Sequence, residues 1–334
     1  RDAQESRGLG DVYKRQVHYR AVDTLPADTQ TARKHLATPP RRPVFALDDA
    51  GLQTLYQDLG RQGNGNLGVT TSGSSDRASA RTANAAVGNK RNATLLENVG
   101  GLTMTALAET VICVTGADAD VTVGGRPAPL ATPTIVPAGA EVAVKPARLG
   151  FRTYVAVRGG LIADTELDSA ATDMLSGLGP KPLAAGDTIA MSLTPPQSAN
   201  SLLSNPLRVE RDGADVVGVV RCVLGPRDDW FDQDAVDRFF ATTFTVTGDS
   251  NRVGLRLESD APLTRSRDGE LPSEGMVAGS VQIPPSGQPV LFLRDHAVTG
   301  GYPVIATVIN EDVDIAAQLP PGGKLRFERY TLEG

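Results

Sequence analysis

The sequence contains few aromatic residues, few cysteines and no excess of positive charge. Aromatic side chains make up 4% of the 334 residues, which argues against a surface that stacks nucleic-acid bases. The net charge of -6 also argues against a polyanion binder. The two cysteines, Cys113 and Cys222, lie far apart in short apolar runs. We therefore expect buried free thiols in a reducing compartment rather than a disulfide.

Long apolar segments are also missing. No stretch of about 18 apolar residues is present, so no membrane-spanning helix is predicted. The chain begins with Arg1 and has no apolar signal-peptide core near its start. We expect a cytoplasmic protein that contacts neither membrane nor nucleic acid.

Several signatures of catalysis and metal binding are absent. The sequence has neither a G-x-x-x-x-G-K-[ST] phosphate loop nor a G-x-S-x-G nucleophile motif. Only His296 lies outside the polar N-terminal region, and no His/Cys/carboxylate cluster suits a metal. Residues 63–68 fit G-x-G-x-x-G, but more loop follows them and no strand-helix alternation, so a dinucleotide site is not predicted. Their backbone N–H groups could still face an anion.

The pattern that is present is a series of short apolar runs bounded by Gly, Pro or Asp, which predicts an all-β protein with a few short helices. The expected strands are 44–47, 102–107, 110–115, 120–123, 134–136, 141–144, 153–157, 188–192, 207–209, 216–224, 244–246, 280–283, 289–294, 304–309 and 324–329. Helices are expected over 77–87, 234–240 and 313–319, the first capped by Asp76. We expect a first domain over 44–198 and a second over 206–331, joined by a polar linker.

Residues 295–303, Asp-His-Ala-Val-Thr-Gly-Gly-Tyr-Pro, form a polar loop between two apolar runs. Loops on a rigid scaffold commonly carry binding or catalytic groups, and paired glycines let the backbone approach a ligand. An ordinary turn between two core strands fits the same residue types. His296 is accordingly either a site residue that works with Asp295 or a hydrogen-bonded corner residue.

Three arginines, Arg61, Arg252 and Arg256, are candidates for binding a carboxylate or phosphate. Arg252 and Arg256 are four positions apart and would share one face of a strand. The alternative is a pair of solvent-facing arginines near Glu258 and Asp260. Four polar residues beside glycines suit turns and caps as well as a site: Ser72, Asp76, Ser273 and Glu274. For Asp76 the helix cap is the favoured interpretation.

Several motifs occur together across about residues 44 to 330. They are Gly51-Leu52-Gln53-Thr54, Gln57-Asp58-Leu59-Gly60-Arg61-Gln62-Gly63, Ser72-Gly73 with Asp76, Leu96-Glu97, Tyr154-Val155-Ala156-Val157-Arg158-Gly159-Gly160, Ser250-Asn251-Arg252-Val253-Gly254-Leu255-Arg256-Leu257, Ser273-Glu274-Gly275, Gln282-Ile283-Pro284-Pro285 and Thr299-Gly300-Gly301-Tyr302-Pro303. This combination resembles the C-subunit family of bacterial ATP-dependent 5-oxoprolinase. The same family is described as allophanate hydrolase subunit 2-like, as Kip antagonist-like, or as the biotin-dependent carboxyltransferase domain of urea amidolyases.

The resemblance implies two cyclophilin-like β-barrels in one subunit of a hydrolase complex. Such a complex converts 5-oxo-L-proline to L-glutamate and hydrolyses ATP. Its A and B subunits are the implied partners, and the Kip-inhibitor-like B subunit is the direct one. No segment resembles a biotin attachment site, so this function is favoured over the carboxyltransferase of a biotin-dependent urea carboxylase. A non-catalytic Kip-type regulatory binding module is the third alternative.

The resemblance also suggests a set of site residues and no metal. The expected catalytic residues are Asp295, His296 and Thr299. The expected substrate-binding residues are Gln57, Asp58, Arg61, Ser72, Asp76, Arg252, Arg256, Ser273, Glu274, Gln282, Gly300, Gly301 and Tyr302. The chain departs from the family pattern at Ala297 and Val298, where Gln-Thr or Pro-Thr is usual, and at Ser74 and Ser75, where a bulky apolar residue usually precedes the Asp.

The first 43 residues do not match the family. Residues 1–16 are polar and unpatterned, and we expect them to come from outside the gene. Residues 17–22 predict one strand, and residues 17–38 are interpreted as the end of a B subunit that is fused upstream. Residues 1–43 are thus expected to be an extraneous or upstream-derived tail and linker.

Overall fold

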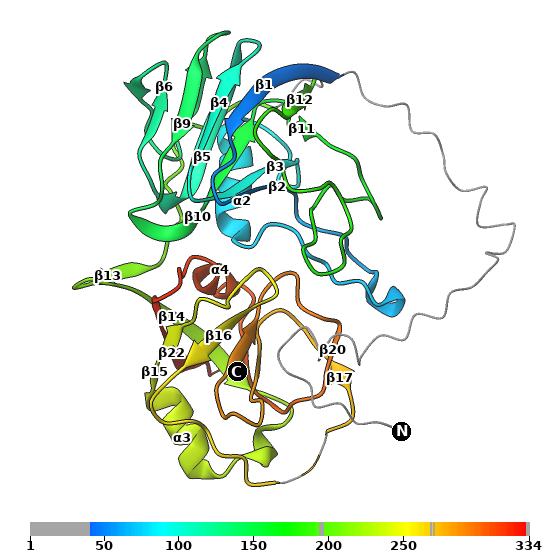
Figure 1. Ribbon diagram of the computed structural model, residues 1–334, viewed down its shortest axis with the longest axis vertical. Coiled ribbons are helices and arrows are strands. Elements are labelled where there is room, and N and C mark those ends of the chain that lie inside the picture. The colour runs from blue at the N-terminus through cyan, green and yellow to red at the C-terminus, as the bar shows by residue number, and fades with distance from the viewer. Residues whose placement is uncertain (1–40, 194–196, 268, 270, 332–334) are drawn as a thin grey trace, which may run out of the picture.

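The computed structural model describes residues 41–193, 197–267, 269 and 271–331. Strands dominate this part of the chain, together with three α-helices and two short 3-10 helices, Gly65–Leu67 and Asp228–Trp230. The sheets built from residues 41–192 share no strand pair with those built from 210–329. The molecule therefore has two halves, which Figure 1 shows one above the other.

The first half consists of two open sheets. The seven-stranded sheet runs β11 (Leu161–Ile162), β12 (Thr188–Ser192), β1 (Arg41–Asp49), β4 (Leu102–Ala106), β9 (Glu141–Val144), β6 (Val121–Val123) and β7 (Arg126–Pro127). The five-stranded sheet runs β2 (Gln53–Gln57), β3 (Leu95–Val99), β10 (Leu149–Val157), β5 (Thr110–Asp118) and β8 (Thr134–Val136). One hydrophobic core contains Phe45 of the larger sheet together with Leu96 and Val155 of the smaller one.

The second half closes into a barrel of seven strands. Its order is β14 (Asp215–Leu224), β21 (Val304–Val308), β18 (Ser280–Gln282), β19 (Val290–Phe292), β16 (Gly254–Glu258), β15 (Thr243–Val246) and β22 (Lys324–Arg329), and β22 pairs with β14 in parallel. β13 (Glu210–Asp212) extends β14 at the edge, and β17 (Glu274–Gly275) pairs with β20 (Thr299–Gly300). Phe239 stacks on Phe327 in the core, with ring centroids 4.4 Å apart.

The expectation of two closed barrels is met only in the second half. In the first half the outer strands of the two sheets do not pair with each other among the described residues. Their apolar faces are buried instead by packing sheet against sheet, which satisfies the hydrophobic pattern without closing the ring of hydrogen bonds. Alternating strands alone do not distinguish these two solutions.

The helices follow the predicted capping signals. Asp76 caps α2 (Arg77–Ala86) by accepting from the Ser79 backbone N–H at 2.9 Å. The predicted helix at 234–240 is α3 (Gln233–Ala241), whereas the last predicted helix is shorter than expected and forms α4 (Val313–Ala316). The predicted strand at 207–209 is wrong, because regular pairing starts at Glu210.

The remaining structural expectations have mixed outcomes. Cys113 and Cys222 are free and buried, as predicted, and burial raises the pKa of each thiol to about 12. No helix in the described ranges is long and apolar enough to cross a membrane. The predictions for residues 1–40, including the upstream strand and the tail, fall outside the described residues.

Candidate functional site

A buried ion network joins the two halves, and we call Arg252, Asp295, Glu97, Ser72 and Ser75 the clasp. Arg252 donates to the Asp295 carboxylate from Nε at 2.9 Å and from Nη2 at 3.1 Å. Its Nη1 donates to Ser75 Oγ at 2.6 Å and also to Glu97. The side chains of Arg252, Asp295 and Glu97 are at most 2% exposed. A buried charge needs a partner of opposite charge. Arg252 is that partner for Asp295 in its own half and for Glu97 in the other half.

Local backbone pairing explains how the second half presents its part of the clasp. Arg252 lies in the turn before β16 and Asp295 follows β19, the strand that pairs with β16. The Asp295 N–H donates to the Arg252 carbonyl at 3.1 Å, which places the two side chains next to each other.

A tight loop presents the part from the first half. Ser72 and Gly73 have φ of 52° and 89°. A Cβ on Gly73 would lie 2.6 Å from the Gly60 nitrogen, so only glycine fits there. The Gly73 carbonyl accepts from Arg252 Nη2 at 2.6 Å, and Ser72 Oγ donates to Asp295 Oδ1 at 2.6 Å.

Electrostatics stabilise the charged form of Glu97. Burial favours its neutral form, but Arg252, Arg152 and the Ser75 N–H outweigh burial, so the pKa of Glu97 lies below its ordinary value. Arg152 Nε lies 3.6 Å from the carboxylate, and the Tyr154 hydroxyl donates to it at 3.0 Å. Burial, followed by the charge of Glu97, raises the pKa of Tyr154 well above its ordinary value. Tyr154 is therefore a neutral donor at physiological pH.

Asp295 is held by four donors. Two come from Arg252 and one from Ser72, and the fourth is the Met174 N–H at 3.0 Å. Both carboxylate oxygens are thus occupied by groups of the protein. The geometry suits Asp295 to anchoring the loops around it, whereas the family resemblance implied a catalytic role.

His296 is the group next to the clasp with a free ring nitrogen. It is 8% exposed, and its Nδ1 lies 2.8 Å from the Ala297 carbonyl, which assigns the proton to Nδ1. Nε2 has no hydrogen-bond partner among the described residues and is left with a lone pair. Burial lowers the pKa of His296 below its ordinary value. The imidazole is therefore neutral near pH 7 and can accept a proton at Nε2.

Three buried polar side chains, Gln57, Arg61 and Asp173, form a second group that we call the inner polar cluster. Gln57 Nε2 donates to the Thr172 carbonyl at 2.8 Å, and Arg61 Nη1 lies 4.0 Å from Asp173 Oδ2. Gln57 Oε1, Arg61 Nη1 and Asp173 Oδ2 are all buried without a hydrogen-bond partner. Because buried polar atoms are rarely left unpaired, this combination of one donor and two acceptors suits a polar ligand or water.

The segment after Thr172 connects the inner polar cluster to the clasp. Asp173 accepts from the N–H groups of Leu175 and Ser176, and the intervening Met174 N–H donates to Asp295. Asp173 also acts on His296, because its charge favours protonation of the imidazole. No sequence signal selects Asp173, since nothing in a polar loop indicates which carboxylate is buried.

Other predicted residues support the loops of the first half. Asp58 accepts from the Gly60 N–H, from Ser169 Oγ and from the Ala170 N–H at 2.7 to 2.8 Å. Asp76 caps α2, as its favoured interpretation required, and also accepts from Gln318 Nε2 at 2.8 Å across the boundary. Burial and then the charge of Asp314 raise the pKa of Asp76 to about 6.

Several other predicted residues of the second half lie on or near the short strand pair β17–β20. Glu274 forms an ion pair with Arg227 and lies in β17, which pairs with the strand holding Thr299 and Gly300. Gln282 Nε2 donates to the Tyr302 carbonyl at 3.0 Å. Ser273 is exposed, Gly301 is half-buried, and neither Arg256 nor Arg61 shares a hydrogen-bond partner with Arg252. The three arginines therefore belong to separate hydrogen-bond networks.

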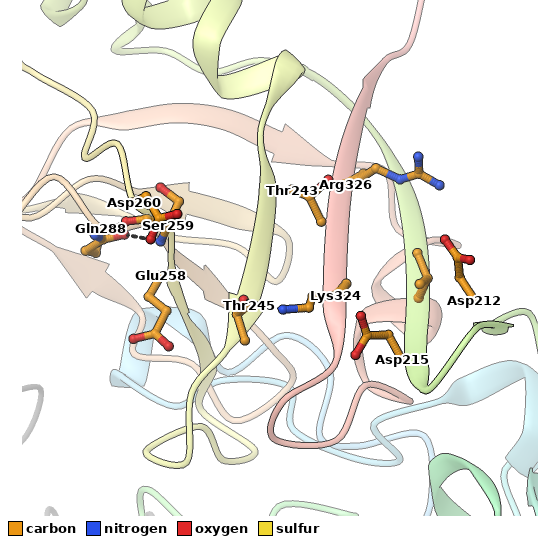
Figure 2. Close-up of a pocket in the computed structure, with 11 residues that line it drawn as sticks. Asp212, Asp215, Thr243, Thr245, Glu258, Ser259, Asp260, Gln288, Lys324 and Arg326 are labelled. Carbon is orange, nitrogen blue, oxygen red and sulfur yellow. Dashed lines mark hydrogen bonds between the residues drawn. The ribbon is translucent and has the colours of Figure 1, made fainter.

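A surface depression of about 630 Å³ lies elsewhere, on the outside of the barrel. Figure 2 shows its polar lining, with Lys324 reaching Thr245 and with Asp215 and Glu258 nearby. None of the predicted site residues lines it. The candidate site is therefore the clasp with His296 and the inner polar cluster.

Comparison with known proteins assigns the chain to a family. A family model described as carboxyltransferase domain, subdomain A and B, matches residues 67–329, and the chain belongs to this family. Among curated relatives, the C subunit of 5-oxoprolinase from Escherichia coli (strain K12) is 31% identical over 296 residues, which cover 85% of this chain and 90% of that protein. The urea amidolyase of Lachancea kluyveri is 28% identical over 312 residues, which cover 85% of this chain and 17% of that protein.

Solved structures support the same relationship. A crystal structure of the protein TTHA0988 matches with a TM-score of 0.75 and 33% identity, covering 87% of this chain and 56% of that one. The chain thus spans about half the length of that protein. The Kluyveromyces lactis urea amidolyase shares the fold, with a TM-score of 0.79 and 24% identity over 88% of this chain and 19% of that one.

Proposed function

We propose that the chain is the C subunit of an ATP-dependent 5-oxoprolinase, which converts 5-oxo-L-proline to L-glutamate together with A and B subunits. The observation that carries the proposal is the identity of 31% to the E. coli C subunit over 85% of this chain and 90% of that protein. ATP is bound by the complex, and the direct partner is the Kip-inhibitor-like B subunit. The same proposal includes three further points. Both halves are related to cyclophilin-like β-barrels, the two domains span 44–198 and 206–331, and the protein is cytoplasmic.

The candidate site offers groups that suit hydrolysis of a cyclic amide. The reaction adds the oxygen of water to the ring carbonyl carbon and breaks its bond to nitrogen, which leaves as the amine. Neutral His296, with its free Nε2, is suited to accept a proton from the attacking water. In the inner polar cluster, Arg61 Nη1 suits the substrate carboxylate, and Gln57 Oε1 suits the lactam N–H.

The clasp would hold these groups in place. Asp295 and Arg252 fix the loop that carries His296, and the Met174 N–H ties the segment with Asp173 to the same carboxylate. The backbone of Thr299, Gly300 and Gly301 would face the ligand. Groups held by packing and by further hydrogen bonds can keep the geometry that catalysis requires.

A carboxyltransferase acting with a separate biotin carrier is the second candidate. It is favoured by the family description and by the identity of 28% to a urea amidolyase over 85% of this chain. The chain corresponds to 17% of that relative, so the remaining activities of that protein would have to come from other chains.

Reconstitution separates the two candidates. The full chain is purified with candidate A and B subunits, and glutamate formed from 5-oxoproline is measured with and without ATP. The proposal expects glutamate only when ATP and all three subunits are present. Carboxylation of urea that depends on a biotin carrier, without glutamate formation, would support the second candidate. Tight binding to the B subunit without either activity would indicate a regulatory binding module.

A further inference from the structure

An arginine-rich groove lies at the boundary between the halves. It is lined by Arg77, Ala78 and Arg81 of α2, by residues 205–208, and by Arg294, Asn310, Glu311 and Asp314 of the second half. Its volume of about 550 Å³ is within the usual range of small-molecule sites, roughly 300–1,000 Å³. Figure 1 shows α2 and α4 near each other at this boundary, where the Ala78 N–H donates to Asp314 at 3.0 Å.

Positive charge exceeds negative charge in this groove. Four arginines line it, at positions 77, 81, 208 and 294, against the two carboxylates Glu311 and Asp314. Arg294 pairs with Asp314 at 2.9 Å and Arg208 with Asp312 at 3.0 Å. Arg77 and Arg81 form no ion pair among the described residues, so the excess charge lies on α2.

Two of these arginines are also incompletely hydrogen-bonded. Arg294 is 3% exposed, and the buried Nε atoms of Arg294 and Arg77 have no partner. The hydrogen bonds of Arg77 Nη2 to the Ser72 and Leu59 carbonyls are long, at 3.3 and 3.4 Å. Burial, followed by repulsion from Arg294, lowers the pKa of Arg77 to about 10. An anion in the groove would relieve this repulsion and supply the missing acceptors.

We propose that the groove binds the phosphate groups of a small molecule through Arg77 and Arg81, with Arg208 and Arg294 at its sides. Guanidinium forks match phosphate oxygens in geometry. The two arginines of α2 are the ones without an ion-pair partner among the described residues, which favours a ligand with more than one negative charge. A nucleoside triphosphate is the ligand that fits the proposed function, and this identification rests on that function. The phosphate site itself rests only on the arginines of the groove.

In each half, an arginine of the groove is a close sequence neighbour of the clasp. In the first half, Arg77 donates to the carbonyl of Ser72, and the Ser72 hydroxyl donates to Asp295. Arg294 directly precedes Asp295. A ligand that draws Arg77 toward the groove therefore acts on the loop that completes the clasp.

Calorimetric titration of the full chain tests the site directly. Pyrophosphate, ATP and L-glutamate are titrated separately at low salt into the original chain and into Arg77→Gln, Arg81→Gln and Arg126→Gln. Arg126 is an exposed arginine on β7, away from the groove, and serves as the matched control. We expect pyrophosphate and ATP to bind, and each groove variant to weaken that binding about tenfold or more without changing any binding of glutamate.

The outcomes are distinguishable. Absence of pyrophosphate binding, or equal binding by Arg126→Gln and both groove variants, overturns the phosphate site. Pyrophosphate binding without ATP binding supports the site and overturns only the nucleotide. Arg81 is exposed, so Arg81→Gln keeps the test valid if circular dichroism shows that Arg77→Gln does not fold. Glutamate formation by the complex without phosphate binding to this chain would refute the groove and leave the proposed function standing.

Discussion

Replacing Arg252 by alanine removes the central cation of the clasp. The substitution leaves Glu97 and Asp295 buried, at 2% and 0% exposure, without their shared counter-charge. It also removes the donors to the Ser75 hydroxyl and the Gly73 carbonyl. Breaking one side of a buried ion pair costs about 3–5 kcal/mol, because a charge is left uncompensated.

That loss is large enough to measure as a shift in urea denaturation. With an m value of roughly 3 kcal/mol/M, a loss of about 4 kcal/mol lowers the midpoint by about 1 M. The single Trp230, which is 9% exposed, reports unfolding of the barrel by fluorescence, and circular dichroism reports both halves. Because the clasp spans the boundary, both probes should shift together in Arg252→Ala.

Arg148→Ala is the matched control. Arg148 also pairs with two carboxylates, Asp118 and Asp120, but its side chain is 53% exposed and theirs are 42% and 67% exposed. Exposed ion pairs contribute little to stability, because water and salt screen them. The urea denaturation midpoint of Arg148→Ala should therefore hardly change. Equal small shifts in Arg252→Ala and Arg148→Ala would refute the reasoning, since the buried network would then not hold the halves together.

Three further predictions concern the same region. The pKa of Glu97 is lowered in the fold, so its contribution to stability is present above about pH 4.3 and is lost as pH falls through the folded value. Glu97→Gln should flatten that acid limb in denaturation midpoints measured against pH, and an unchanged limb would contradict this. In the reconstituted complex, His296→Gln should lower kcat by roughly 10²–10⁴-fold. The original complex should lose activity as the pH falls through a value below 6.5, and the variant should lack this loss. An unaltered pH profile of activity would exclude proton transfer by His296. A Cβ in Gly73→Ala would lie 2.6 Å from the Gly60 nitrogen, whereas the control Gly125→Ala has a similar φ but open space around it. Gly73→Ala should lower the free energy of unfolding by roughly 2 kcal/mol or more and Gly125→Ala by about 1 kcal/mol. Equal shifts in melting temperature would show that the loop around Gly73 adjusts to the added methyl group.

Local signals predicted much of the secondary structure. The Asp76 cap fixed the start of α2, and the predicted strand at 324–329 coincides with β22. Barrel closure depends instead on the parallel pairing of β14 with β22, whose partners are more than 100 positions apart, as Val217 and Lys324 show. Short-range patterns contain no information on such pairing, so the closed barrel and the open sheets could not be told apart.

The residues of the clasp were predicted only in part. Ser72, Arg252 and Asp295 were selected, and the structure brings them together. Glu97 stood in a family motif without being assigned to the site, and Arg152 was not considered. Both are strand residues whose importance comes from burial beside Arg252, and burial of a charge is set by tertiary packing rather than by neighbouring residues.

The distribution of these charges makes the two halves one structural unit. Arg252 and Asp295 come from the second half, and Glu97 with Arg152 from the first, so each half supplies one acid and one base. Arg252 nevertheless gives hydrogen bonds to three groups of the first half, the Ser75 hydroxyl, the Glu97 carboxylate and the Gly73 carbonyl. Separated halves would lose these bonds, together with the Ser72 bond that orients Asp295 beside His296. Any chemistry at His296 therefore requires the assembled chain, and mixing separately expressed halves should restore it only if the clasp forms again between them.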